Sequence, residues 1–144
     1  MNSSSDLNPL ILVVEDDEDT RLLLRTLLEM RGMRVVEELD GKSGLRAAEE
    51  IHPDLILMDL TLPTLDGLAA TRLIRERATL RHVPVVITSG HADPRAKEAA
   101  FAAGCSYYLV KPVDFDQLDC ILLKYLTSKS LRSSGRGLIP SRKN

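Results

Sequence analysis

Acidic residues follow two apolar segments of this 144-residue sequence, in an arrangement suited to holding a metal ion. Leu55–Met58 is an uninterrupted apolar run that ends at Asp59, and Leu10–Val14 is followed by Glu15 and Asp16. Such short runs predict strands covered on both faces, as in parallel sheets. Carboxylates brought together repel one another, and their pKa values rise unless a cation lies among them. Mg²⁺ prefers a few carboxylates, several waters and a phosphate, so these acids indicate metal and phosphate chemistry.

Two further strand ends carry polar groups that are able to contact a phosphate. Val83–Thr88 ends at Thr88 and Ser106–Val110 is followed by Lys111, whereas strand 34–39 contributes no such group. Ligands of open α/β sheets bind outside the carboxyl ends of the strands. That edge would therefore collect three acids, a hydroxyl and an ammonium group. The alternative is that each polar residue only ends its strand, as Asp commonly does in turns.

The elements that must position these residues alternate between strand and helix along the chain. The apolar patterns predict five strands, at residues 10–14, 34–39, 55–59, 83–88 and 106–110. Five helices follow them: one ending at Gly32, then about 41–51, 66–77 and 94–104, and a last helix from Asp114 to about Leu126. This alternation predicts an α/β fold with a parallel sheet and right-handed crossovers.

Composition limits the class of protein. With 44% hydrophobic and 28% charged residues, the sequence predicts one globular domain with a single core. Cys105 and Cys120 lack the spacing of a metal knuckle or a redox pair, which favours a reduced, cytoplasmic protein. No apolar run approaches the roughly 20 residues of a membrane span, and Met1–Asn8 does not resemble a signal peptide.

Charge separates the end of the chain from the rest. Residues 127–144 hold five Lys or Arg and no acid, so the 14 basic and 21 acidic residues before them leave a net charge of −7. We expect a disordered N-terminus at 1–8, a folded domain at 9–127 and a basic, disordered tail at 128–144. Contact of this tail with nucleic acid or membrane is a lesser alternative. The residues after Leu126 are too few for an output domain, so we expect output through protein contacts.

Four motifs together resemble the receiver domain of two-component response regulators, over about Leu10–Leu126. They are Val13-Val14-Glu15-Asp16-Asp17, Met58-Asp59 with Pro63 and Asp66-Gly67, Ile87-Thr88-Ser89, and Tyr108-Leu109-Val110-Lys111-Pro112. The resemblance implies a flavodoxin-like, doubly wound fold whose five parallel strands have the order 2-1-3-4-5, with helices on both faces. It also implies a phosphoacceptor signalling protein rather than an enzyme. Asp59 would take a phosphoryl group from a sensor histidine kinase or a histidine phosphotransfer protein.

The resemblance gives roles to the other polar residues of the edge. Asp16 would ligate Mg²⁺ directly, Glu15 mostly through water, and Asp59 and the backbone carbonyl of Thr61 would complete the protein ligands. Lys111 would contact a phosphoryl oxygen. These roles agree with the chemistry, because phosphoryl transfer depends on neutralising the charge of the equatorial oxygens. The alternative for Lys111 is a salt bridge to Asp59 without function.

Thr88 and Tyr108 resemble the switch pair of the family. Phosphorylation would draw the Thr88 hydroxyl inward and let Tyr108 rotate, altering a target-binding face formed by helix 94–104, strand 106–110 and the last helix. Thr61 and Gly90 would flank the path of attacking water and set the lifetime of the phosphoryl group. Without a side chain Gly90 cannot orient water, so we expect moderate to slow self-dephosphorylation. The alternative is that Gly90 only gives backbone freedom, with water entering unhindered and a short lifetime.

Three other readings use the same residues. A phosphatase of the haloacid dehalogenase type also has a strand-end Asp and Mg²⁺, but it needs a general acid where Thr61 stands. A flavin-binding protein would need a phosphate loop where this chain has Glu15–Asp19, and acids repel phosphate. A receiver-like adaptor would bind partners without phosphorylation. We expect no direct DNA binding and no membrane span. For a receiver, the sequence leaves a stand-alone effector and a phosphorelay intermediate both open.

Overall fold

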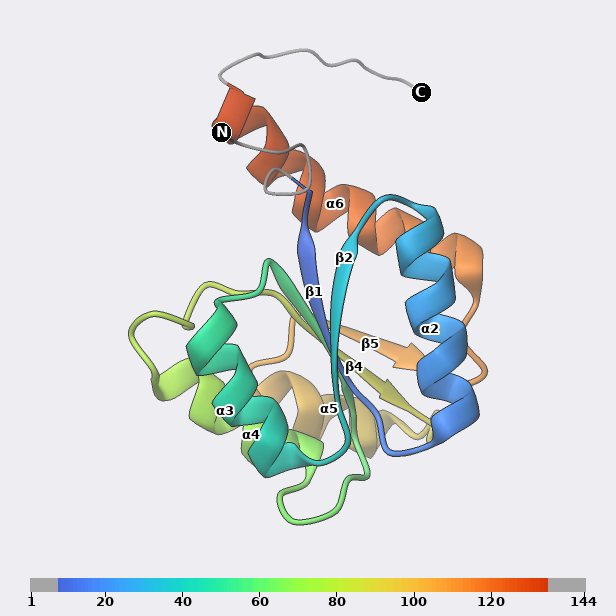
Figure 1. Ribbon diagram of the computed structural model, residues 1–144. Coiled ribbons are helices and arrows are strands. Elements are labelled where there is room, and N and C mark those ends of the chain that lie inside the picture. The colour runs from blue at the N-terminus through green and yellow to red at the C-terminus, as the bar shows by residue number, and fades with distance from the viewer. Residues whose placement is uncertain (1–7, 135–144) are drawn as a thin grey trace. The chain divides into compact units, whose positions relative to one another are not determined.

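The computed structural model describes the backbone of residues 8–134 and the side chains up to Leu126. Its sheet has five parallel strands in the order β2-β1-β3-β4-β5 (Figure 1). The strands are β1 Leu10–Val14, β2 Arg34–Glu38, β3 Leu55–Asp59, β4 Val85–Ser89 and β5 Tyr107–Val110. The predicted α/β class and strand order are therefore confirmed.

Five helices alternate with these strands. They are α2 Glu18–Met30, α3 Gly41–Ile51, α4 Gly67–Glu76, α5 Pro94–Ala103 and α6 Phe115–Ser134. Figure 1 shows α2 on one side of the sheet and α3, α4 and α5 on the other. The chain divides into two units, residues 1–113 and 114–144, so α6 is described by itself. Among the described residues, no helix is long and apolar enough to cross a membrane.

The core lies around the three central strands of the first unit. Every residue of β3 and β4 is buried, and in β1 only Leu10 is partly exposed. Edge strand β2 is half-buried throughout, in keeping with its weaker apolar pattern. Central parallel strands are covered by helices on both faces, which is why their sequences are uninterrupted apolar runs. A rigid sheet therefore holds the residues at its carboxyl edge.

Aspartates begin all four helices of the first unit. The side chain of each accepts a hydrogen bond from a backbone N–H two or three residues later and so satisfies a donor that the helix leaves unpaired. These N-caps are Asp17, Asp40, Asp66 and Asp93. Each of the four caps lies in the loop that follows a strand at the carboxyl edge of the sheet. The acids of these loops are thus divided between helix capping and the site.

Several boundaries differ from the sequence prediction by one or two residues, and the end of α6 differs by more. β4 begins at Val85 rather than Val83, because Pro84 has no N–H for a sheet ladder, although its carbonyl still accepts a bond from Ile56. α6 extends to Ser134, past the expected end at Leu126, since the first helix-breaking residue after Phe115 is Gly135. The predicted tail at 128–144 thus shares its first residues with α6, and residues 135–144 and 1–7 lie outside the described part of the chain.

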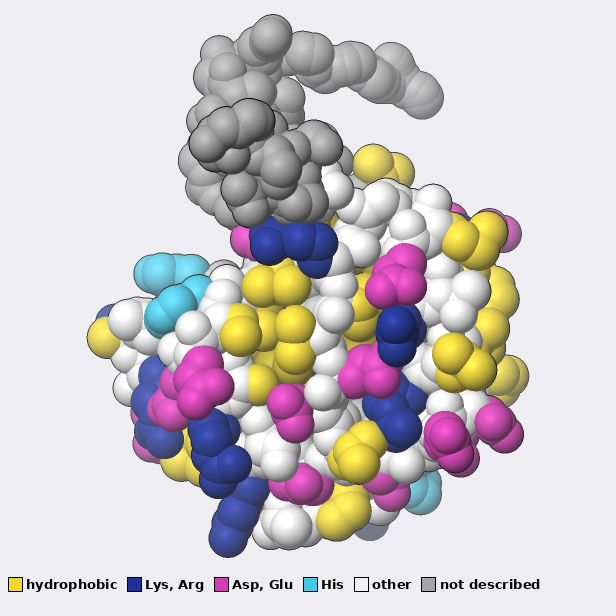
Figure 2. All heavy atoms as spheres, in the orientation of Figure 1, with side chains coloured by type: hydrophobic (Ala, Val, Ile, Leu, Met, Phe, Trp, Pro, Cys, Tyr) yellow, Lys and Arg dark blue, Asp and Glu magenta, His cyan; other side chains and the backbone are white. Residues whose placement is uncertain are grey.

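The surface of the face shown in Figure 2 mixes charges of both signs. Lys and Arg side chains lie next to Asp and Glu side chains, and no large patch of a single sign appears on this face. Hydrophobic side chains gather at the margin of the view where Figure 1 places α2. The exposed hydrophobic residues of that helix are Leu22, Leu23 and Met30.

Candidate phosphoacceptor and metal site

The carboxyl edge of the sheet brings the predicted acids together. Asp59 is the last residue of β3, and Glu15 directly follows β1, which pairs with β3 up to Val14 and Met58. One carboxylate oxygen from each of Glu15, Asp16 and Asp59 lies within 4.8 Å of the others. Glu15 is 1% exposed and Asp59 6%, whereas Asp16 is exposed. Two acids are thus held inside the protein and the third is exposed to solvent.

Lys111 reaches into this cluster from the end of β5. Its Nζ lies 3.1 Å from Glu15 Oε1 and 3.3 Å from Asp59 Oδ1. Partial burial by itself lowers the pKa of Lys111, but the hydrogen bond to Glu15 and the charge of Asp59 outweigh it, so that the pKa lies above its ordinary value. Lys111 is therefore a fixed positive charge beside the predicted nucleophile.

Glu15 lies in surroundings that disfavour its charged form. Burial raises its pKa and the charge of Asp59 adds to this effect, while hydrogen bonds from the Asp17 N–H and from Lys111 oppose it. The net pKa is above the ordinary value of a glutamate. A site that holds more negative charge than Lys111 neutralises is suited to a hard cation with oxygen ligands.

The remaining predicted residues surround Asp59. The Thr61 N–H lies 3.4 Å from Asp59 Oδ1, so the loop after β3 turns back over the carboxylate. Thr88 is the β4 residue paired with Asp59 and is 2% exposed. Gly90 is exposed in the loop after β4, and a Cβ built on it would meet no atom within 4 Å. The structure thus brings Thr61 and Thr88 to the site and leaves space at Gly90.

Tyr108 is buried, with its hydroxyl turned toward the loop after β4. The hydroxyl donates a 2.7 Å hydrogen bond to the backbone carbonyl of His91, and the His91 N–H in turn donates to Ser89 Oγ. Tyr108 is 5% exposed, whereas its neighbour Tyr107 is half-buried. The predicted switch residue thus connects β5 to the loop that carries Gly90.

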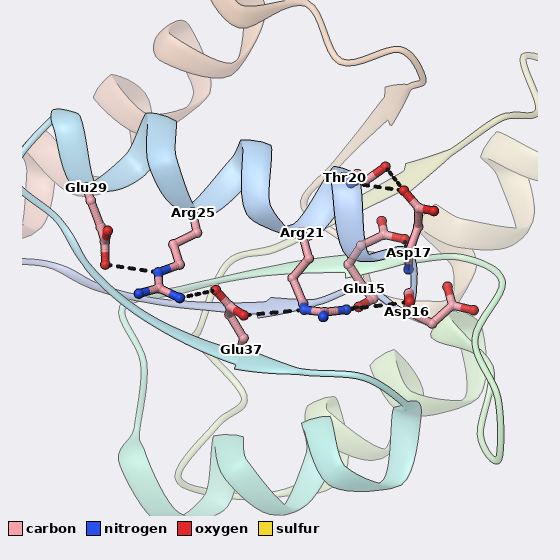
Figure 3. A network of polar contacts seen from close by, with 8 residues as sticks. All are labelled: Glu15, Asp16, Asp17, Thr20, Arg21, Arg25, Glu29 and Glu37. Atoms are coloured by element: carbon pink, nitrogen blue, oxygen red, sulfur yellow. Dashed lines mark hydrogen bonds and ion pairs between the residues drawn. The ribbon is translucent and has the colours of Figure 1, made fainter.

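Two residues next to the site were not predicted from the sequence. The guanidinium of Arg21, in α2, donates to the backbone carbonyl of Glu15 at 3.0 Å and pairs with Glu37 of β2 at 3.3 Å (Figure 3). β2 adds no group to the acid cluster itself, as expected, but through Glu37 it supports the loop that carries two of the acids. The sequence signal for this pair was Glu37, a charged residue within the half-buried strand β2. Periodicity alone does not tell which cation such a residue contacts.

Comparison with known proteins identifies the family. Residues 11–122 match the model of the response regulator receiver domain. The chain belongs to this family.

Two curated relatives show how receiver domains of this kind occur. The polar-differentiation response regulator DivK of Brucella ovis is 34% identical over 116 residues, which cover 81% of this chain and 94% of DivK. The regulatory protein AtoC of Escherichia coli is 30% identical over 128 residues, which cover 89% of this chain but only 27% of AtoC. The receiver domain thus spans nearly all of the first relative and about a quarter of the second.

Solved structures of receiver domains have the same fold. The receiver domain of the sensor histidine kinase PA1611 from Pseudomonas aeruginosa, described with a magnesium ion coordinated in its active site cleft, is 36% identical with a TM-score of 0.78, covering 83% of this chain and 98% of that one. The receiver domain of the Saccharomyces cerevisiae response regulator Ssk1, solved with the histidine phosphotransfer protein Ypd1, is 25% identical with a TM-score of 0.79, covering 86% and 92%. The predicted family and flavodoxin-like fold are confirmed.

The donor set of this receiver domain fits a magnesium ion. Three carboxylates offer oxygens at close range, two of them buried, and oxygen is the ligand that Mg²⁺ prefers. The exposed Asp16 leaves one side of the cluster open to water and to a phosphate. The backbone carbonyl of Thr61 as a further ligand stays a prediction.

Proposed function

We propose that this receiver domain accepts a phosphoryl group on Asp59 from the phosphohistidine of a sensor kinase or a phosphotransfer protein. In this step the phosphorus–nitrogen bond of the donor breaks while a phosphorus–oxygen bond to the Asp59 carboxylate forms. The observation that carries the proposal is the buried Asp59 carboxylate, 3.3 Å from Lys111 and grouped with Glu15 and Asp16. The complex of Ypd1 with the related Ssk1 receiver supports a phosphotransfer protein as one class of donor.

The residues of the site divide the work of this reaction. Lys111 and the Thr61 N–H both contact Asp59 Oδ1 and so fix the orientation of the carboxylate. Lys111 also places a positive charge where the phosphoryl oxygens would lie. A bound Mg²⁺, held by Glu15, Asp16, Asp59 and the Thr61 carbonyl, would supply further positive charge to those oxygens.

The consequence of phosphorylation would be a change of protein contacts. We assign the switch to Thr88, which lies beside Asp59, and to Tyr108, which holds the β4–α5 loop through the His91 carbonyl. A shift of the Thr88 hydroxyl toward the phosphoryl group would alter this loop and with it the surface of α5 and β5, which we propose as the target-binding face. Such a switch needs two states only a few kcal/mol apart.

Replacement of the acceptor tests the proposal. Wild-type protein incubated with acetyl phosphate and Mg²⁺ should gain one acid-labile phosphate, and omitting Mg²⁺ or adding EDTA should prevent this. Asp59→Asn should gain none, because an amide is a poor nucleophile. Asp66→Asn is the matched control: Asp66 is seven residues away and caps α4 through the Ala69 N–H. Labelling of Asp59→Asn at the wild-type rate would show that the acceptor lies elsewhere.

A second experiment addresses the partners. Wild-type protein with and without beryllofluoride, which mimics an acyl phosphate, should capture different proteins, and Tyr108→Ala should lose the difference. Equal capture by the two forms, with Asp59 phosphorylated normally, would favour the adaptor reading over the switch.

A further inference from the structure

A network of polar contacts supports the loop that carries Glu15 and Asp16 (Figure 3). Arg21 extends from the first turn of α2, and its Nη1 lies 3.0 Å from the Glu15 carbonyl oxygen and 3.5 Å from that of Asp16. Its Nε lies 3.3 Å from Glu37 Oε1 in β2. The Arg21 side chain is 15% exposed, so this guanidinium is largely enclosed between α2, β2 and the loop.

The backbone of Glu15 is therefore held on both sides. Its N–H donates to the Glu38 carbonyl of β2 at 3.0 Å, and its carbonyl accepts from Arg21, which Glu37 of the same strand holds in place. A guanidinium is a rigid planar fork, so the bond to Glu37 fixes where the Nη1 donor points. Fixing the peptide that joins Glu15 to Asp16 sets the direction from which both side chains leave the backbone.

We propose that Arg21 is a positioning residue for the metal-binding acids, held in register by Glu37. This inference rests on the proposed function, since it concerns the geometry of the Mg²⁺ ligands Glu15 and Asp16. Arg21 offers no ligand atom itself. It acts through the backbone, as residues behind metal ligands commonly do.

If Arg21 acted only through its charge, its removal would change Mg²⁺ affinity in the opposite direction from the one expected for a positioning residue. A positive charge near a cation site repels the cation, so loss of the charge alone would tighten Mg²⁺ binding. Loss of positioning would weaken binding, because the ligand loop would have to be ordered when the ion arrives. The sign of the change therefore separates the two roles.

Arg25 provides a matched control in the same network. It pairs with Glu37 Oε2 at 3.2 Å and with Glu29 Oε2 at 3.3 Å, and its side chain is 49% exposed. Within the described part of the chain, its hydrogen bonds go to these two acids and not to the loop carbonyls. Arg25→Met thus removes a positive charge and a Glu37 contact from the same helix without removing the support of the loop.

The experiment measures Mg²⁺ affinity by titration calorimetry for wild type, Arg21→Met, Arg21→Lys, Glu37→Gln and Arg25→Met. Arg21→Met should bind Mg²⁺ about 10-fold more weakly, the usual effect of losing a group behind a metal ligand. Arg21→Lys keeps the charge, but an ammonium group cannot contact both the Glu15 carbonyl and Glu37 as the guanidinium does. Glu37→Gln keeps Arg21 but removes the charged partner that holds its guanidinium in place. Both variants should weaken Mg²⁺ binding to a smaller extent than Arg21→Met. Arg25→Met should bind as wild type does or slightly more tightly.

Amide hydrogen exchange in EDTA provides a readout that needs no metal. Exchange at Glu15 and Asp17, whose N–H groups donate to the Glu38 carbonyl and to Glu15 Oε2, should quicken in the Arg21 variants. Leu24, buried in α2, should keep its protection. The inference is overturned if Arg21→Met binds Mg²⁺ as tightly as wild type or more tightly, or if exchange at Glu15 and Asp17 is unchanged. Failure of wild type to bind Mg²⁺ would instead overturn the proposed function, and exchange would then decide the positioning role alone.

Discussion

Burial divides the three acids of the site into two kinds. Glu15 and Asp59 are almost completely buried and contact Lys111, whereas Asp16 is exposed. Burying a carboxylate is costly unless it has a charged or hydrogen-bonding partner, so the contacts with Lys111 offset part of the cost of burying these two acids. Asp16 is the acid that an incoming ion can reach without any rearrangement of the core. The three residue types were evident from the sequence, but this difference between them was not.

Gly90 allows a prediction about the lifetime of the phosphoryl group. Positive φ angles occur at Gly32 and Gly104 but not at Gly90, so backbone freedom does not explain this glycine, and a side chain there would meet no neighbour. Gly90→Glu should therefore fold normally and orient a water for in-line attack. We expect phosphoryl decay to quicken about tenfold, equivalent to a barrier lower by about 1.4 kcal/mol.

The decay of protein labelled with acetyl phosphate, followed after removal of the donor, measures this effect. Gly90→Ala is the control, since it adds a side chain that cannot orient water, and Thr61→Asn tests the second flanking position. Equal decay of Gly90→Glu and Gly90→Ala would exclude the water-orienting role and leave open access of water as the reason for the glycine.

At the scale of elements, the sequence predicted what local signals determine. Central strands appear as apolar runs because both their faces are covered, and α5 was placed by Asp93, Pro94 and Gly104, which act as N-cap, first residue and C-cap. Because each strand of a parallel sheet ends at the same edge, the strand ends in turn predicted the members of the site. The end of α6 was missed because the tail composition resembled disorder while containing no helix breaker before Gly135.

Local sequence patterns could not predict the contacts between loops that lie far apart in the chain. Thr64 has a positive φ of 65°, an unusual conformation for a β-branched residue, and its hydroxyl donates to Asp40 at 3.0 Å, 24 residues away. Gly41 belongs to the same contact, since a Cβ there would lie only 1.7 Å from the Leu65 carbonyl oxygen. The β3–α4 loop, which begins beside Asp59, is therefore docked on the N-terminus of α3. The Arg21–Glu37 pair was missed for the same reason.

Asp40 makes this docking dependent on pH. Hydrogen bonds from the Ser43 N–H, the Thr64 hydroxyl and the Ser43 hydroxyl lower the pKa of Asp40. An acid with a lowered folded-state pKa stabilises the protein fully above its unfolded value of 3.8, and this stabilisation is lost as the pH falls through the lowered value. We expect Asp40→Ala to lose about 1 kcal/mol at pH 7, as for other N-caps, and less in acid.

Urea unfolding of wild type and Asp40→Ala between pH 7 and pH 3 measures this difference. The difference should stay constant down to about pH 5 and then shrink, since protonation of Asp40 weakens the same hydrogen bonds in wild type. Thr64→Val serves as the control, because it removes one partner of Asp40 but leaves the cap of α3 in place. A difference that is the same at all pH values would show that the charge of Asp40 does not contribute.

At the scale of the whole molecule, the acids of the site lower the stability of the metal-free protein. Three acids and one ammonium group lie at the carboxyl edge of a sheet whose central strands are mainly apolar. Burial, and after it the charge of Asp59, raises the pKa of Glu15. A raised acid pKa means that stability falls as the pH rises from the ordinary value of 4.5 through the raised value. A bound cation would therefore stabilise the native state, in which these acids lie together, more than the unfolded chain, in which they do not.

Metal binding should accordingly raise the melting temperature of the protein. A ligand that binds only the native state at 100 times its dissociation constant adds about 2.7 kcal/mol, or roughly 5–10 °C for a chain of this size. Asp16→Ala should lose most of this rise, and because Asp16 is exposed, its removal should leave the metal-free protein folded. Thermal scans in EDTA, in MgCl₂ and in NaCl of equal ionic strength separate specific binding from screening. A rise of the same size in Asp16→Ala would place the stabilising ions elsewhere on the acidic surface, and an equal effect of NaCl would reduce the observation to relief of repulsion among the acids.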